Sequence, residues 1–125
     1  MKTYQGGCHC GRIRFEADID LSKVTECNCS ICSKKGSLNL RVAPGHFRLL
    51  SGEDALTLYQ FGLKIARHWF CKYCGIHTFW NPRAAPDQYS INVRCLDDFE
   101  TEKPNIEVKV FDGRNWEETI KTFKF

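Results

Sequence analysis

The chain has 125 residues, of which 42% are hydrophobic and 26% charged, values that are ordinary for one globular domain and argue against a disordered chain. Eighteen basic and fifteen acidic side chains leave a formal net charge of +3, too small a bias to indicate nucleic-acid binding. No apolar run approaches the length of about 20 residues needed to cross a bilayer, and the first residues carry no apolar signal segment. We therefore expect one domain over residues 1–125 in the cytoplasm, without a nucleic-acid or membrane partner.

The pattern of side chains predicts an all-β fold. Short segments of alternating, β-branched or aromatic residues recur along the chain, and turn signals such as Pro44-Gly45 and Asn81-Pro82 separate them. The expected strands are, in chain order, Arg12–Ala17, Leu38–Val42, Leu56–Phe61, Ile65–Phe70, His77–Trp80, Tyr89–Val93 and Ile106–Phe111. Only Trp116–Phe123 has the pattern of a short helix, with acidic residues in its first turn. We therefore expect antiparallel sheets in a sandwich or open barrel, with at most a short C-terminal helix.

Cysteine is the unusual residue, because the chain contains 8 of them. Cys95 stands alone, and the other seven form three tight clusters: Cys8-x-Cys10, Cys27-x-Cys29-x-x-Cys32 and Cys71-x-x-Cys74. A disulfide framework is the alternative, but it is typical of secreted proteins, and bridges inside such short loops are strained. Clusters with one or two intervening residues suit thiolates that converge on one ion, and sulfur-rich tetrahedral sites select zinc or iron–sulfur clusters. We therefore predict bound zinc.

Two of the clusters have matching ends. Cys71-Lys72-Tyr73-Cys74-Gly75 looks like half of a zinc-ribbon site, and Cys8-His9-Cys10-Gly11 finishes with the same Cys-Gly pair. A glycine such as Gly75 can adopt a positive φ, which lets the backbone turn its amides toward the sulfurs. Together the two halves offer four thiolates, a complete tetrahedral set that joins the start of the chain to its middle. We predict that this site is structural.

The third cluster leaves one position undecided. Cys27, Cys29 and Cys32 supply three sulfurs from one short loop, and three protein ligands with an open position are typical of a catalytic zinc. The alternative is that Cys95 or a histidine closes the site as a fourth protein ligand.

Basic residues follow this cluster. Three thiolates on one zinc ion carry a net charge of −1, which suits a substrate thiol that binds, loses its proton and remains a nucleophile. Lys34, Lys35 and Arg41 could offset the thiolate charge and attract an anionic thiol such as glutathione. The alternative for these cations is a solvated surface loop.

The histidines are expected to be structural. His9 and His77 each lie within three residues of a predicted ligand and could be donors to the ligand sulfurs. His46 and His68 lie in turn or strand segments, where packing or surface positions are expected. No residue is an obvious general acid or base.

Several segments together resemble the glutathione-dependent formaldehyde-activating enzyme (GFA) family, which also includes centromere protein V. The specific ones are Gly7-Cys8-His9-Cys10-Gly11, Cys27-Asn28-Cys29-Ser30-Ile31-Cys32 and Phe70-Cys71-x-x-Cys74-Gly75. The resemblance continues through Ile91-Asn92-Val93 and Leu96-Asp97 to Phe111-Asp112-Gly113-Arg114-Asn115-Trp116, whose last five residues look more like the centromere-protein-V branch.

The resemblance implies an all-β tent of antiparallel sheets around two zinc ions per chain. It places a structural zinc on Cys8, Cys10, Cys71 and Cys74, and a catalytic zinc on Cys27, Cys29 and Cys32. The implied activity is that of a carbon–sulfur lyase, which joins glutathione, a small thiol, to formaldehyde, a small aldehyde, as S-hydroxymethylglutathione. The chain is shorter than the characterised enzyme, whose extra segments help to hold glutathione. The alternative function is a non-catalytic zinc-stapled β module that binds a protein, as in centromere protein V-like proteins.

Overall fold

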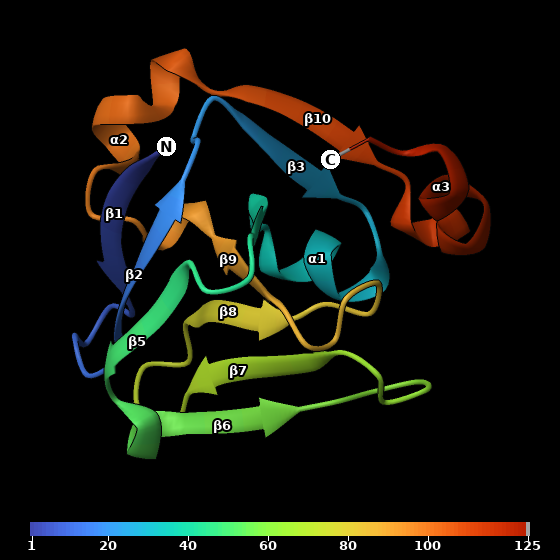
Figure 1. Ribbon diagram of the computed structural model, residues 1–125. Coiled ribbons are helices and arrows are strands. Elements are labelled where there is room, and N and C mark those ends of the chain that lie inside the picture. Colours follow the sequence, from blue (N-terminus) through green and yellow to red (C-terminus); the bar gives the residue numbers. More distant parts are fainter. Residues whose placement is uncertain (125) are drawn as a thin grey trace.

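The computed structural model describes residues 1–124 and consists mainly of two β-sheets (Figure 1). The smaller sheet has the order β1-β2-β5, with β1 at Lys2–Gly7, β2 at Arg14–Ile19 and β5 at Phe47–Ser51. The larger sheet has the order β10-β3-β4-β9-β8-β7-β6. Its strands are β3 (Lys23–Cys27), β4 (Asn39–Val42), β6 (Leu56–Tyr59), β7 (Arg67–Cys71), β8 (His77–Asn81), β9 (Tyr89–Asn92) and β10 (Glu107–Phe111).

Three short α-helices complete the described chain: α1 (Ser30–Lys35), α2 (Phe99–Glu102) and α3 (Trp116–Thr122). Single 3₁₀ turns lie at Glu53–Ala55, Val93–Cys95, Lys103–Asn105 and Gly113–Asn115. None of the helices in residues 1–124 has the length and apolar character that a membrane crossing requires.

The predicted all-β fold with a short C-terminal helix is confirmed, and each expected strand is present with its ends shifted by at most two residues. The expectation of purely antiparallel sheets is wrong at one edge, where β10 runs parallel to β3, with Val108 opposite Val24. A parallel pair needs a long connection rather than a hairpin, and most of the chain lies between these two strands.

Five elements were not expected from the sequence: β1, β3, β5, α1 and α2. Strand β3 buries one large apolar side chain, Val24, and β1 likewise buries only Tyr4, so neither shows the alternation that indicates a strand. Helix α1 was not expected because its N-cap residue is a cysteine, whereas Ser, Thr, Asp and Asn are the residues that usually cap a helix. Here the sulfur of Cys29 accepts the backbone N–H of Cys32.

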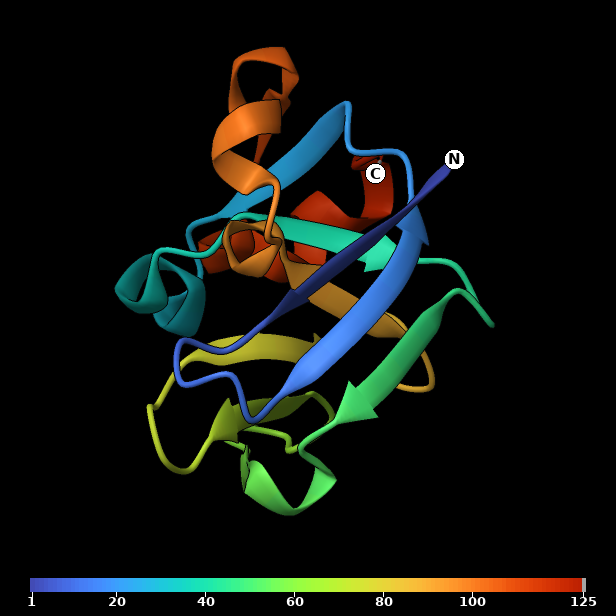
Figure 2. The ribbon, with the colours of Figure 1, turned by 90° about the vertical axis from the view of Figure 1, so that its left-hand side faces the viewer.

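The core lies where the smaller sheet crosses the larger one (Figure 2). Phe15 on β2 and Ile91 on β9 are fully buried there. Phe47 on β5 stands at the centre of an aromatic group, with its ring centroid 5.7 Å from that of Phe15, 4.9 Å from Phe79 and 4.4 Å from Tyr89. Packing of this kind fixes β8 and β9, and these strands form the middle of the surface on which the candidate site is built.

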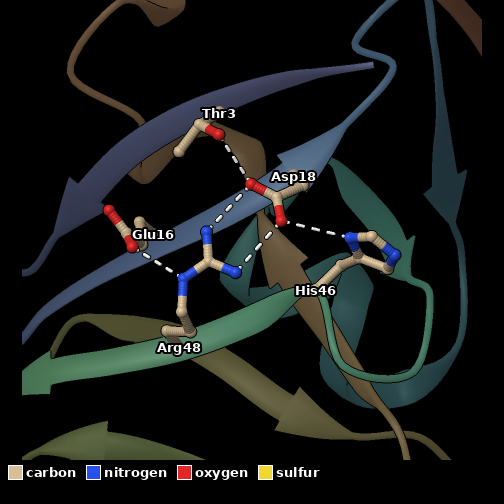
Figure 3. Close-up of polar contacts among 5 residues, drawn as sticks. All are labelled: Thr3, Glu16, Asp18, His46 and Arg48. Atoms are coloured by element: carbon tan, nitrogen blue, oxygen red, sulfur yellow. Dashed lines mark hydrogen bonds and ion pairs between the residues drawn. The ribbon is translucent and has the colours of Figure 1, made fainter.

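A polar network on the smaller sheet holds its strands in register (Figure 3). The guanidinium of Arg48 on β5 donates to both carboxylate oxygens of Asp18 on β2, at 3.0 and 2.9 Å, and to Glu16 at 2.6 Å. Thr3 on β1 donates to Asp18 at 2.6 Å, and Nδ1 of His46 lies 3.1 Å from the same carboxylate. Asp18 therefore links β2 to a strand on each side.

Removal of this carboxylate gives a pH-dependent test. The pKa of Asp18 lies well below its usual range because Arg48 first, and then Thr3 and His46, bond to the ionised form. A depressed folded-state pKa contributes stability that is present above the ordinary Asp value of about 3.9 and is lost as pH falls toward the folded-state value. We expect Asp18→Asn to lower the free energy of unfolding in urea at pH 7, and the difference from wild type to shrink below about pH 4. Asp87→Asn, at an exposed loop position, is the control, and a difference that is constant with pH would contradict the assignment.

Candidate metal centres

The first cysteine group brings together the two matching clusters. The sulfur atoms of Cys8, Cys10, Cys71 and Cys74 all lie within 4.8 Å of one another. The Cys8–Cys10 and Cys10–Cys71 Sγ–Sγ distances are both 3.6 Å, far longer than the disulfide bond of about 2 Å. Zn–S bonds of about 2.3 Å in a tetrahedron place sulfurs roughly 3.8 Å apart. The four cysteines therefore fit a zinc ion without rearrangement of the chain.

Two tight turns present these sulfurs. In the turn between β7 and β8, Gly75 has a φ of +79°, as predicted, and the backbone N–H of Cys74 donates to the sulfur of Cys71 at 3.4 Å. In the turn between β1 and β2, the N–H of Ile13 donates to the sulfur of Cys8 at 3.3 Å. Hydrogen bonds from the backbone stabilise the thiolate form that a metal requires.

The second group comes from the end of β3 and the start of α1. The sulfurs of Cys27, Cys29 and Cys32 also lie within 4.8 Å of one another. Cys29 N–H donates to Cys27 at 3.5 Å, Cys32 N–H donates to Cys29 at 3.4 Å, and the side-chain amide of Asn39 donates to Cys32 at 3.5 Å. The pKa of Cys29 is lowered because Cys27 and then Cys32 donate to its sulfur. The pKa values of Cys27 and Cys32 are raised by their interaction with Cys29 and by burial, so the loop favours one thiolate, at Cys29, before any metal is bound.

No further Cys, His, Asp or Glu within residues 1–124 joins the second group. The sulfur of Cys95 lies 4.0 Å from the carbonyl oxygen of His77, and burial raises the pKa of this thiol to about 12. His9 is exposed and lies outside both groups. The arrangement in the described chain is therefore four sulfurs at one centre and three at the other.

A cavity of about 560 Å³ adjoins the three-sulfur group. Side chains on β3, β4, β7, β8 and β9 line one side of it: Thr25, Asn39, Arg41, His68, Trp80 and Ser90. The turn after β6, residues 61–66, and the C-terminal segment from Phe111 to Ile120 supply further walls. Figure 1 shows that turn and α3 on the right of the view, with α1 nearer its centre. The three-sulfur group therefore faces a space large enough for a bound molecule.

Lys35 is a half-buried cation beside this group. Its ammonium donates to Nδ1 of His77 at 2.7 Å and lies 3.7 Å from the centroid of the Trp80 ring. Burial lowers the pKa of Lys35 to about 8, although the thiolates of the second group, Cys32 foremost, act in the opposite direction. Of the cations singled out in the sequence, Lys35 and Arg41 lie at the site, whereas Lys34 is exposed and does not line the cavity.

His68 is a cavity residue that the sequence did not reveal. Its side chain is 5% exposed, its ring stacks on Phe61 at 5.7 Å, and its Nδ1 has no hydrogen-bond partner in the described part of the chain. Burial, followed by the charge of Lys35, lowers the pKa of His68 to about 4, so the ring is neutral at pH 7. The available signal was a histidine within the expected strand Ile65–Phe70, which more often indicates packing.

The C-terminal segment is joined directly to the second cysteine loop. The amide of Asn28 donates to Asp112 at 3.1 Å and its oxygen accepts the backbone N–H of Arg114, also at 3.1 Å. Gly113 packs so closely that a Cβ there would lie 2.5 Å from the sulfur of Cys27. Only glycine fits at this approach, and the contact fixes one wall of the cavity against the cysteines.

The comparisons with known proteins agree with this geometry. Residues 3–112 match the model of the family described as glutathione-dependent formaldehyde-activating enzyme. The crystal structure of a Rhodobacter sphaeroides protein has 34% sequence identity and a TM-score of 0.76, and the similarity covers 85% of this chain and 98% of that one. With a family match over most of its length and both cysteine groups in place, this chain belongs to the glutathione-dependent formaldehyde-activating enzyme family.

Proposed function

We propose that the protein is a zinc-dependent carbon–sulfur lyase that adds a small thiol of the glutathione type to an aldehyde such as formaldehyde, or cleaves the resulting adduct. The observation that carries the proposal is the second group, in which Cys27, Cys29 and Cys32 meet beside a cavity without a fourth protein ligand among the described residues. Family membership supports chemistry related to glutathione and formaldehyde. Free thiolates persist in reducing compartments, and we therefore place the protein, as one domain over residues 1–125, in the cytoplasm.

Two zinc ions are assigned different roles. Cys8, Cys10, Cys71 and Cys74 would hold a structural ion, because four sulfurs complete its coordination. Cys27, Cys29 and Cys32 would hold the second ion, whose remaining position would receive the substrate thiol. Zinc bound there would lower the pKa of the substrate thiol, so that the thiol ionises near neutral pH.

The cations of the site suit an anionic substrate. Lys35 offsets the net negative charge of a three-thiolate zinc centre from its half-buried position. Arg41 and Arg114 line the cavity, and a guanidinium pairs with a carboxylate through two parallel hydrogen bonds. Glutathione carries two carboxylates, so these side chains can orient its thiol toward the second cysteine group.

His68 is placed to move the proton. When a thiol adds to an aldehyde, the S–H bond and the C=O π bond break, an S–C bond forms, and the proton passes from sulfur to oxygen. A neutral imidazole in the cavity can accept this proton and return it to the oxygen. Cleavage of the adduct follows the same path in reverse.

A non-catalytic module that binds a protein partner is the second candidate. It is favoured by the exposed apolar side chains on the two edge strands of the larger sheet, Leu58 and Tyr59 on β6 and Val108 and Val110 on β10. Edge strands with exposed apolar residues can pair with another chain. Thiol binding at the second centre separates the two candidates.

The proposal is tested with cobalt-substituted protein, whose visible spectrum reports changes in metal coordination. We expect glutathione to alter the spectrum of the wild-type protein, because its thiolate takes the open position. Cys29→Ser should abolish the change, and Cys95→Ala, which leaves both groups intact, should retain it. A spectrum that stays unaltered across a panel of small thiols would exclude the thiolate mechanism.

The two centres should differ in their contribution to folding. Cys71→Ser removes a ligand that joins two distant turns, and because metal-binding energy in small domains is folding energy, we expect loss of most β structure by circular dichroism. Cys29→Ser should preserve the strands while the zinc content falls from two ions toward one. Metal analysis of the purified variants checks the stoichiometry. Equal destabilisation by both substitutions would contradict the division into structural and catalytic centres.

His68→Asn should lower the kcat of adduct formation by roughly 10²–10⁴-fold, the usual contribution of general acid–base catalysis. Because the pKa of His68 is lowered to about 4, the neutral ring persists as pH falls. At saturating thiol, the acid limb of the wild-type profile should therefore follow ionisation of the bound thiol rather than titration of His68. The control is His46→Asn, in the loop before β5 and outside the cavity. An unchanged rate in His68→Asn would remove this residue from the mechanism.

A further inference from the structure

The cavity is larger than formaldehyde requires. Its volume is about 560 Å³, whereas a molecule with two heavy atoms occupies on the order of 60 Å³ if a liquid water takes about 30 Å³. Cavities of several hundred cubic ångströms hold whole organic ligands. The space beside the second cysteine group can therefore receive a substituent on the reacting carbon as well as the thiol.

Two of the walls carry large apolar side chains, although the cations Lys64 and Arg83 also line the cavity. In the turn after β6, Phe61, Leu63 and Ile65 line the cavity although their side chains are exposed to solvent, at 42, 74 and 40%. Trp116 and Ile120 line it from α3. Exposed large apolar side chains that gather around a cavity indicate that an apolar ligand group covers them.

Several contacts connect the wall formed by α3 to neighbouring parts of the chain. The guanidinium of Arg83 lies 3.9 Å from the centroid of the Trp116 ring and bonds to Glu117 at 2.7 Å. The hydroxyl of Thr119 donates to the carbonyl oxygen of Asp112 at 2.9 Å and so fastens the helix to the end of β10. Residues beyond 112 lie outside the range that the family model matches.

The charges at the cavity decide which reactant carries the apolar group. The guanidinium groups of Arg41 and Arg114 can pair with the carboxylates of a polar thiol. Such a thiol has no apolar group that would cover the apolar side chains of the walls. Building on the function proposed above, we propose that the aldehyde substrate carries an apolar chain or ring of several carbons, bound between Trp116 and Ile120 on one side and Phe61 and Ile65 on the other. The thiol adds across the C=O bond, the S–C bond forms, and the thiol proton ends on the oxygen, with no further reactant.

Stable thioethers of glutathione test this assignment without turnover. S-methyl-, S-propyl- and S-hexylglutathione carry the thiol portion together with an apolar chain of increasing length. Calorimetric titration of the zinc protein should show affinity rising by about fourfold for each methylene that becomes buried. Trp116→Ala and Ile120→Ala should each remove about tenfold or more of the gain between the methyl and hexyl compounds, with little effect on the methyl compound.

Val110→Ala is the matched control, because Val110 is a 63% exposed apolar residue outside the cavity; it should leave the whole series unchanged. The ratio of kcat/KM for hexanal to kcat/KM for formaldehyde should also fall in the two cavity variants. It should fall by the factor by which each variant reduces the affinity gain between the methyl and hexyl compounds. Equal affinities for all three thioethers, in a protein whose cobalt spectrum responds to glutathione, would overturn this inference while leaving the proposed function intact. Tighter binding of hexanethiol than of glutathione would assign the apolar group to the thiol and likewise overturn it. An unresponsive cobalt spectrum would reject the proposed function itself.

Discussion

The arrangement of the whole molecule depends on the convergence of two turns that are far apart in the sequence. The turn carrying Cys8 and Cys10 belongs to the smaller sheet, and the turn carrying Cys71 and Cys74 belongs to the larger one. Four sulfurs within 4.8 Å of one another therefore connect the sheets at a single point. With the aromatic group around Phe47 as a second junction, the sheets have one relative orientation available. Strands β3 and β4 are held in the larger sheet, and with them the loop that carries the other three cysteines.

The cavity beside those cysteines combines cationic and apolar surface. Arg41 and Arg114 make part of it cationic, and the apolar turn after β6 faces part of it from another side. A half-buried cation such as Lys35 costs solvation free energy, yet it is oriented by His77 and by the ring of Trp80 and so retains a fixed place near the thiolates. A site of this composition discriminates between ligands by charge at one end and by shape at the other.

The features that could be predicted from the sequence were mainly those set by residues close together in the chain. The seven clustered cysteines sort into two groups from spacing alone, because ligands separated by one or two residues share a turn. Strands with regular alternation, such as Tyr89–Asn92, were recognised for the same reason, whereas β3, with Val24 as its one buried large side chain, was not. The bond between Asn28 and Asp112 joins residues 84 positions apart, and no periodicity reports such a contact. The place of His68 in the cavity wall likewise depends on its pairing with Trp80 across β7 and β8.

The position of Gly113 against Cys27 has a consequence for the order in which the site is assembled. Both cysteine groups lie within the first 74 residues, whereas the segment that covers the second one follows later in the chain and is synthesised after them. During translation the three thiolates are thus available to a metal from the side that β10 and α3 later occupy. Once β10 has paired with β3 and Asn28 has bound the backbone beyond Asp112, that approach is closed. In the finished protein metal can then reach this centre from the cavity side, and from the other side only when the C-terminal segment detaches transiently, a local opening that hydrogen exchange can follow.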